Sequence, residues 1–460
     1  MSTPLGEVMA LTMFVGVFIA LMAGFPVAFT IGGISVLFAA VGSMLGAFDW
    51  PLMAGATGRM LDAVVSDTLV AVPLFVFMGV VLERSRIAED LLITMGQAFG
   101  RLSGGLGISV IVVGALLAAS TGIVGATVVS MGLISYPAMM RANYDKRLAA
   151  GVITASGTLA QLLPPSTVLI LVGTLLQNAN TQASLARGDF SAAPVTVTDL
   201  FLGAILPGLA MVAVFILFVV VVAILQPRRC PAIEMSDHER ATLGRRMLRA
   251  MLPPFLLIVA VLGAILGGLA TATESAAIGA IGACVLAIVR GNLPLRMLRD
   301  ICTGTLRLSV MIYVILFGAT IFSLVFRGFG GEKVAEDVLQ ALPGGAYGAL
   351  IATLVFMLVL GFFIDTFEII FIVVPIFGPV LIKLGIDPLW LGVLMATVLQ
   401  TSYLTPPFGF AIFYLQGVAK ELPIGTIYRG VMPFVVLQLL VLVMVLVFPG
   451  LATWIPRAAQ

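Results

Sequence analysis

Charge is scarce in this chain. Only 10% of its 460 residues are Asp, Glu, Lys or Arg, whereas 61% are apolar. A soluble domain carries about 25% charged residues, so a soluble protein is excluded. The near-balance of 24 basic and 22 acidic residues argues against nucleic acid as a partner. The composition therefore predicts an all-α integral membrane protein that contacts the lipid bilayer.

Residues for catalysis and metal binding are equally scarce. The single histidine, His238, excludes an H-E-x-x-H zinc motif and lies in a charged loop, where no intramembrane Ser–His pair can form. No G-x-x-x-x-G-K-[ST] sequence is present, so the chain is not its own ATPase. Cys230, Cys284 and Cys302 have no spacing typical of zinc sites or disulfides. The sequence thus predicts neither an enzyme nor a bound cofactor.

Long apolar runs dominate what is present. A membrane span needs about 20 apolar residues, and this length predicts ten full spans, near residues 5–23, 26–46, 68–84, 146–178, 198–225, 250–269, 274–290, 303–326, 388–420 and 427–449.

Two further segments, 105–140 and 345–382, are apolar but interrupted midway. The arm "GLGISVIVVGALLAA" has 15 residues, or about 22 Å of helix, against a hydrocarbon core of about 30 Å. Short arms around a break predict a re-entrant hairpin, which enters and leaves the membrane on one side. Its non-helical tip is tolerated only where protein or a water-filled cavity satisfies the backbone.

The basic residues are divided unequally between the two sets of loops that this threading produces. One set carries 18 of the 24 Lys and Arg residues, counting Arg307 just inside the next span; its loops are 84–104, 141–147, 226–249, 290–302 and 420–429. The other set carries Arg59, Arg187, Arg327, Lys333, Lys383 and Arg457. The positive-inside rule assigns the first set to the cytoplasm, and both termini are then periplasmic.

The spacing of the prolines indicates an internal repeat. Pro137 and Pro379 are 242 residues apart, and the Pro164–Pro165 and Pro406–Pro407 pairs have the same separation. Asp145 and Asp387 share this offset. Each half contains five spans and one hairpin, and because five is odd, the halves insert with opposite orientation. We predict an inverted repeat with broken helices at the midplane, the pattern of a secondary transporter.

The predicted organisation has three parts. Residues 1–225 form the first repeat, with its hairpin at 105–140 and its broken helix at 146–178. Residues 226–249 form a cytoplasmic amphipathic linker, and residues 250–460 form the second repeat, with its hairpin at 345–382 and its broken helix at 388–420.

The two Pro-Pro pairs interrupt spans that ought to run straight. Proline lacks an N–H, and its ring clashes with the carbonyl four residues earlier. The carbonyls freed in this way belong to Ala160, Gln161, Ser402 and Tyr403. Bare carbonyls in a membrane cost several kcal/mol each, which a desolvated Na⁺ could offset. The half-helix that follows favours an anion at its N-terminus. The alternative is that both pairs are packing kinks.

The hairpin tips offer further oxygen ligands. The first tip, "AASTGIVGAT" (118–127), is small and rich in hydroxyls, although Gly125 is better explained by close helix packing. The second tip, "GFFIDTFEI" (361–369), contains Asp365. An intramembrane carboxylate is a functional candidate by default, but Asp365 could instead cap the second arm or pair with a basic group. For Glu274 in "TATE", capping is the simpler interpretation.

Three stretches carry a family resemblance: "PAMMRANYDKRLAAGVITASGTLAQLLPPSTVLILVG", "TATESAAIGA" and "FIDTFEIIFIVVPIFGPVLIKLGIDPLWLGVLMATVLQTSYLTPPFG". With them the chain resembles the large membrane subunit of TRAP (tripartite ATP-independent periplasmic) transporters over nearly all its length. The resemblance implies an elevator-type, Na⁺-coupled importer of an organic acid in the bacterial inner membrane. It also implies two partners, a small four-helix membrane subunit and a periplasmic substrate-binding protein. Many members have a Ser-Gly-Ser-Ser-like first tip, where this chain has "ASTGIVGA".

The resemblance maps site residues onto the tips and breaks. The first sodium site would comprise Ala119, Ser120, Thr121, Gly122, Leu163, Pro164 and Pro165. The second would comprise Gly361, Asp365, Leu404, Thr405, Pro406 and Pro407. The substrate would contact Gln161, Ser166, Thr167 and Thr405. A stand-alone carboxylate carrier of the divalent anion/sodium symporter type is the main alternative function, and a channel is a weaker one.

The charge asymmetry generates a topological prediction. Reporter fusions should place the 226–249 loop in the cytoplasm and both 179–197 and the C-terminus in the periplasm, because the first set of loops carries the excess of Lys and Arg. Labelling of the 226–249 loop from the periplasm would overturn the inverted-repeat topology.

Overall fold

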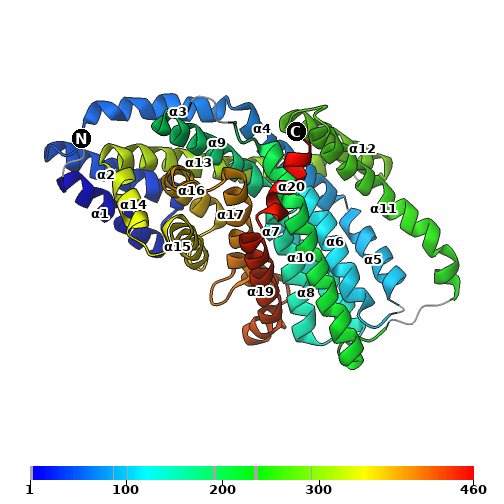
Figure 1. Cartoon of the computed structure of the whole chain (residues 1–460). Coiled ribbons are helices and arrows are strands. Elements are labelled where there is room, and N and C mark those ends of the chain that lie inside the picture. The colour runs from blue at the N-terminus through cyan, green and yellow to red at the C-terminus, as the bar shows by residue number, and fades with distance from the viewer. Residues whose placement is uncertain are drawn as a thin grey trace.

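A computed structural model describes residues 4–85, 87–100, 102–189, 193–232, 237–291 and 293–459, without the side chains of residues 88, 120, 237–242 and 459. Within these ranges all regular structure is helical (Figure 1). The α-helices of the first half are α1 (Pro4–Met22), α2 (Val27–Met44), α3 (Ala54–Val64), α4 (Asp67–Arg84), α5 (Ile87–Phe99), α6 (Gly105–Thr121), α7 (Val124–Arg141), α8 (Lys146–Thr158), α9 (Thr167–Arg187) and α10 (Val197–Leu225). Those of the second half are α11 (Asp237–Leu266), α12 (Ala272–Val289), α13 (Leu295–Gly328), α14 (Gly331–Gln340), α15 (Gly345–Leu360), α16 (Thr366–Lys383), α17 (Pro388–Leu404), α18 (Phe410–Val418), α19 (Ile424–Val447) and α20 (Gly450–Ala459).

Many of these helices are long and apolar enough to cross a membrane. In the described ranges eight single helices meet that requirement, or ten if two bent pairs of helices are each counted as one span. The chain is therefore a multi-pass membrane protein. The expected spans at 5–23, 26–46, 198–225 and 427–449 correspond closely to α1, α2, α10 and α19.

The structure differs from the predicted elements in two respects: it contains amphipathic helices that were not predicted, and some helices begin or end at other residues. The helices α3, α5, α14 and α20 lie in segments that hydropathy alone assigns to loops, because their apolar residues occupy only one face. Helix α11 begins at Asp237 and continues without interruption to Leu266, so the second half of the expected 226–249 linker belongs to the same helix as the span that follows.

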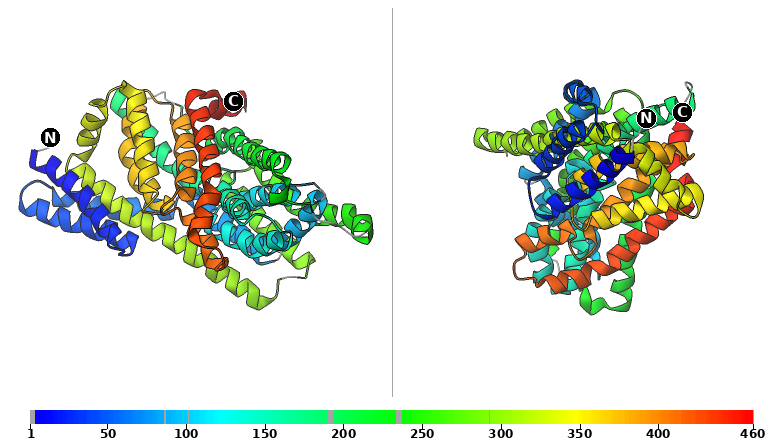
Figure 2. Two further views of the ribbon diagram at one scale, coloured as in Figure 1. Left: turned by 90° about the horizontal axis from the view of Figure 1, so that it is seen from below. Right: turned by 90° about the vertical axis from the view of Figure 1, so that its left-hand side faces the viewer.

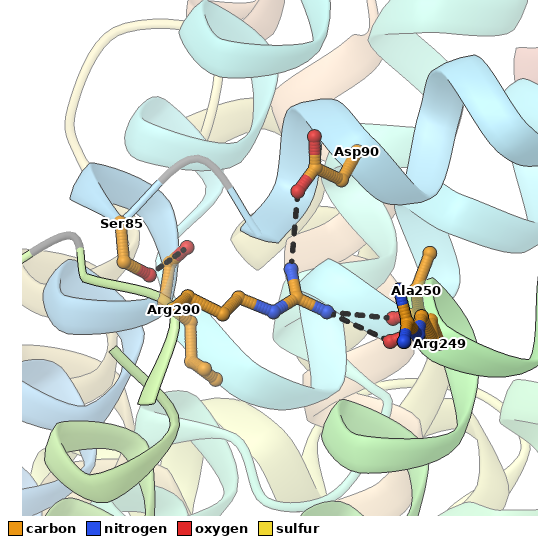
Figure 3. Close-up of polar contacts among 6 residues, drawn as sticks. Ser85, Asp90, Arg249, Ala250 and Arg290 are labelled. Carbon is orange, nitrogen blue, oxygen red and sulfur yellow. Dashed lines mark hydrogen bonds and ion pairs between the residues drawn. The ribbon is translucent and has the colours of Figure 1, made fainter. Parts of the chain in front are cut away.

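The loops of the more basic set lie together at one end of the molecule. The backbone N–H of Gly104 donates to the carbonyl of Cys230 at 2.8 Å, and that of Asp145 donates to the carbonyl of Arg229 at 2.8 Å. Arg290, at the end of α12, reaches α5 and α11 (Figure 3): its Nη1 lies 3.2 Å from Asp90 Oδ2 and its Nη2 3.0 Å from the carbonyl of Arg249. Four of the five loops of this set therefore contact one another.

The less basic set is joined in the same way at the other end. Ion pairs connect Lys383 to Glu336 at 3.4 Å and Arg457 to Asp387 at 3.5 Å. Lys333 pairs with Glu7 at 3.2 Å. Because Glu7 and Arg457 belong to the first and last helices, both termini lie on the same side as this set (Figures 1 and 2).

The two halves of the chain interleave rather than form separate bodies. Helix α8 packs against α19, α9 against α16, α4 against α12, and α2 against α13. Figure 2 shows α13 running along much of the length of the molecule. Helices α8 and α19 cross with their backbones in contact: a Cβ on Gly151 would lie 2.2 Å from the carbonyl oxygen of Gly430. Close packing of this kind buries α8 and α17 almost completely at the centre.

Candidate functional site

Both central helices break at their Pro-Pro pairs, as predicted. After α8, a short 3₁₀ turn ends at Gln161 and α9 starts at Thr167. In the second half, α17 ends at Leu404 and α18 starts at Phe410. We refer to 161–167 as the first break and to 403–409 as the second break, counting the helix-end residues that flank each Pro-Pro pair. All residues of the first break are buried, whereas Pro407 and Phe408 in the second are exposed.

The first hairpin tip contacts the first break directly. Thr167 Oγ1 donates to the carbonyl of Gly122 at 2.7 Å. Gly122 has a φ of +60°, and a Cβ there would lie 3.2 Å from the Thr167 nitrogen. Thr121 Oγ1 is 2.7 Å from Thr127 Oγ1, so its hydroxyl stays within the hairpin. The tip at 119–122 and the 163–165 segment therefore lie together, although the Ser120 side chain is outside the described part of the structure.

The break satisfies some of its own backbone groups. Ser166 Oγ donates to the carbonyl of Gln161 at 2.8 Å, and it caps α9 by accepting from the Leu169 N–H. The Ser402 carbonyl accepts from the Thr405 N–H at 3.2 Å. The carbonyls of Ala160 and Tyr403 lack a helical donor, since a proline stands four residues after each. Two of the four carbonyls that the prolines release are thus paired within the breaks.

The second tip contacts the second break through Asp365. Tyr403 Oη donates to Asp365 Oδ1 at 2.8 Å. Asp365 is also the N-cap of α16, in a reciprocal capping box with Glu368. The capping that the sequence offered as one interpretation of Asp365 is therefore present, and the same carboxylate also contacts the broken helix. Thr405 Oγ1 donates to the carbonyl of Thr401 at 2.7 Å.

Glycine permits the close approach of this tip to α17. A Cβ on Gly361 would lie 2.2 Å from Ser402 Oγ and 2.3 Å from Ser402 Cβ. Such distances are far below van der Waals contact, so any side chain at 361 would push the tip away from the helix.

The two tip–break pairs meet at one small cavity, which we call the inner pocket. Gln161 Nε2 donates to Thr366 Oγ1 at 2.9 Å, and this bond joins the first break to the second tip. The lining residues come from both tips, both broken helices and α13: Gly122, Ile123, Val124, Gly125, Gln161, Val168, Leu308, Met311, Ile312, Asp365, Thr366, Phe367, Tyr403 and Tyr414. Its volume is about 80 Å³, below the range of about 300–1,000 Å³ typical of ligand pockets. A substrate would therefore require the tips to move.

Gln161 has unused hydrogen-bonding capacity at this pocket. The side chain is 2% exposed, and its Oε1 has no hydrogen-bond partner. Either end of an amide can face a neighbouring hydroxyl, so Gln161 can turn its N–H₂ toward the pocket while Thr366 donates to its oxygen. A carboxylate in the pocket would then find a neutral donor.

Sequence reasoning missed Thr366, Tyr403 and Tyr414 as pocket residues. One signal for Tyr403 was available, since it stands 242 residues after Gln161, which is the offset of the predicted repeat. Gly125 packs against the ring of Tyr414, where a Cβ would lie 3.0 Å from Cζ, as close helix packing requires.

Carboxylates do not cluster at this site. Among the described residues no group of three or more His, Cys, Asp and Glu side chains could hold a metal ion. A cation here would depend mainly on neutral oxygens, with Asp365 as the charged group nearest the second break.

A family model and individual relatives match most of the chain. The model described as "Tripartite ATP-independent periplasmic transporter, DctM component" matches residues 14–451. The C4-dicarboxylate TRAP transporter large permease protein DctM of Pseudomonas aeruginosa is 28% identical over 395 residues, covering 85% of this chain and 86% of that protein. The ectoine/5-hydroxyectoine TRAP transporter large permease protein UehC of Ruegeria pomeroyi is 27% identical over 456 residues, covering 97% and 98%.

A solved structure shares the fold. The YdaH transporter of Alcanivorax borkumensis superposes with a TM-score of 0.57 and 18% sequence identity, covering 87% of this chain and 88% of that one. At this identity the likeness concerns the fold alone.

The contact between Gly361 and Ser402 gives a test of the second tip. Gly361→Ala should destabilise the protein by about 1–3 kcal/mol, the usual cost of overpacking, and reduce transport. Adding Ser402→Gly removes the clashing atoms and should restore the apparent melting midpoint of the purified protein. Gly417→Ala, in α18 with open space around it, is the matched control and should be neutral or stabilising. A tolerated Gly361→Ala would show that the tip is not held against α17.

Proposed function

The chain belongs to the tripartite ATP-independent periplasmic transporter family as a large permease (DctM) subunit, and from this premise we propose that it imports an organic acid across the inner membrane by Na⁺-coupled secondary transport. Its relatives are named as transporter permeases, so the chain is a transporter subunit and not an enzyme. The observation that carries the proposal is the bond between Gln161 and Thr366, which brings two hairpin tips and two helix breaks to a single pocket.

The substrate class follows from the chemistry of the pocket and from the relatives. The Gln161 amide and the hydroxyls of Thr366, Tyr403 and Tyr414 are neutral hydrogen-bonding groups suited to a carboxylate. The relatives described above are named for C4-dicarboxylates and for ectoines. Since Ser166 and Thr167 use their hydroxyls within the first break and tip, Gln161 is the residue of the proposed substrate set best placed to bind it.

Sodium suits the oxygen atoms that the breaks expose. Na⁺ accepts neutral carbonyl ligands, and the Ala160 and Tyr403 carbonyls lack helical donors. A bound cation next to the pocket also adds positive charge near the substrate carboxylate. We therefore place one Na⁺ between the first tip and the first break, and another between the second tip and the second break beside Asp365.

Matched element boundaries support an inverted repeat with alternating access. Helices α7 and α16 begin and end at the same 242-residue offset. Asp145 caps α8 by accepting from the N–H groups of Arg147 and Leu148, and Asp387 caps α17 from the equivalent Leu389 and Trp390. Two tips that close on breaks of opposite orientation suit an elevator-type movement of the central helices, with the basic set of loops facing the cytoplasm.

Sodium binding can be measured before the transported acid is known. NaCl should raise the melting midpoint of the purified subunit complex relative to equal choline chloride, because an ion that binds only the folded state stabilises it by mass action. Asp365→Asn should weaken this effect, and Pro164→Ala with Pro165→Ala should weaken it by restoring helical donors. Asp387→Asn is the matched control, since Asn is equally good at an N-cap. With [¹⁴C]succinate as the first probe, uptake that ignores Na⁺ but follows a proton gradient would refute sodium coupling and make Asp365 the candidate proton carrier.

We further propose that transport requires two partners, a small four-helix membrane subunit and a periplasmic binding protein. The described part of the chain has little structure outside its apolar helices with which to capture a dilute ligand. The purified chain alone in proteoliposomes should therefore give little uptake, and adding both partners should restore it. Robust uptake by the single chain would favour a stand-alone carboxylate carrier, and conductance without saturation would favour a channel.

A further inference from the structure

A second and much larger cavity lies between α3, α4, α9, α13 and α16, and we call it the outer cavity. Its volume is about 700 Å³, within the range of about 300–1,000 Å³ typical of small-molecule sites. It lies toward the C-terminal ends of α9 and α13, which lead into loops of the less basic set. Of the expected sodium- and substrate-binding residues whose side chains are described, none lines it.

Two helices present polar stripes to the outer cavity. Along α9 the stripe consists of Thr174, Gln177, Asn178, Thr181 and Gln182. Along α13 it consists of Thr320, Ser323 and Arg327. Spacings of three and four residues place each set on one helix face. In so apolar a chain, two facing polar stripes indicate a surface in contact with water or a polar solute rather than with lipid.

The outer cavity is stacked directly on the inner pocket along three shared helices. Val168 of α9, Ile312 of α13 and Phe367 of α16 line the inner pocket. The nearest outer-cavity residues on the same helices are Leu171, Leu316 and Phe371, which lie three or four positions further on. About one helical turn therefore separates the two spaces. All three separating side chains are apolar and buried, as expected of a barrier.

Basic side chains outnumber acidic ones among the described residues that line the outer cavity. Arg327 is held by an ion pair with Glu332 at 2.7 Å and by a hydrogen bond to Gln182, and its Nε is buried with no hydrogen-bond partner. Arg59, on α3, is exposed at the cavity and interacts electrostatically with both Arg327 and Glu332. Asp62 is the one acidic side chain among the described residues that line the cavity. Two guanidinium groups thus face a space that is polar along two of its walls.

We propose that the outer cavity is a staging site for a small organic anion, which binds between Arg59 and Arg327 before it passes the layer of Leu171, Leu316 and Phe371 into the inner pocket. The proposal rests on the transport function proposed above, and it adds a second binding position on the side predicted to be periplasmic. Arginine suits this role because its planar guanidinium binds carboxylates through paired N–H groups.

Sided labelling of a cysteine in the cavity tests the proposal without knowledge of the substrate. Ser323→Cys is made in a background of Cys284→Ala and Cys302→Ser, which retains the buried Cys230. Intact cells are treated with the anionic reagent 2-sulfonatoethyl methanethiosulfonate or the cationic reagent 2-(trimethylammonium)ethyl methanethiosulfonate. The ratio of anionic to cationic reaction rates at Ser323→Cys should exceed the ratio at Ala341→Cys, an exposed position outside the cavity, by about threefold or more.

Removing the arginines should abolish that preference. Arg59→Gln and Arg327→Gln should each lower the ratio toward the Ala341→Cys value, while Arg327→Lys should retain most of it because the positive charge remains. Equal ratios at the two cysteines, a preference that both Gln variants leave intact, or no external labelling of Ser323→Cys would overturn the staging site. Labelling does not depend on Na⁺, so a failure of the sodium experiments would leave this result unaffected.

Discussion

The missing N–H groups of four prolines are the constraint on which the centre of this protein depends. Pro164, Pro165, Pro406 and Pro407 occupy helices that are otherwise buried among apolar side chains, where an unpaired backbone carbonyl costs several kcal/mol. Water is not freely available there, so partners must come from the protein or from a ligand. Each hairpin tip packs against one break and forms a hydrogen bond with it. Thr167 bonds to Gly122 in the first pair, and Tyr403 bonds to Asp365 in the second.

The two breaks differ in how far they are buried and in which side chains bond to them. The first break is buried throughout, and Ser166 closes it by bonding back to Gln161. The second break is partly exposed, and its tip carries a carboxylate. Gln161 and Tyr403 are separated by 242 residues, the offset of the predicted repeat, yet both bond to the second tip, through Thr366 and Asp365. The second tip is therefore held by both broken helices, and its release would open the inner pocket on two sides at once.

Ion pairs connect the loops at each of the two ends of the molecule. The ion pairs that connect segments far apart in the sequence stay within one set: Arg290 with Asp90 in the basic set, and Lys383 with Glu336, Lys333 with Glu7 and Arg457 with Asp387 in the other. The outer cavity belongs to the less basic end, where Arg59 and Arg327 are among the few cations available to an incoming anion.

Elements with a local physical cause could be predicted from the amino-acid sequence alone. Hydropathy located most long helices, because a membrane span needs a minimum apolar length, and proline chemistry located both breaks, because a missing N–H acts on its own helix. Amphipathic helices such as α5 and α14 were not recognised, since half of each surface is polar. The residues that each tip contacts became apparent only in the folded protein. The Gln161–Thr366 bond joins residues 205 positions apart, and the polar stripes of α9 and α13 become one cavity only when the two helices face each other. Such contacts depend on packing between distant segments, which a single sequence does not encode in any local pattern.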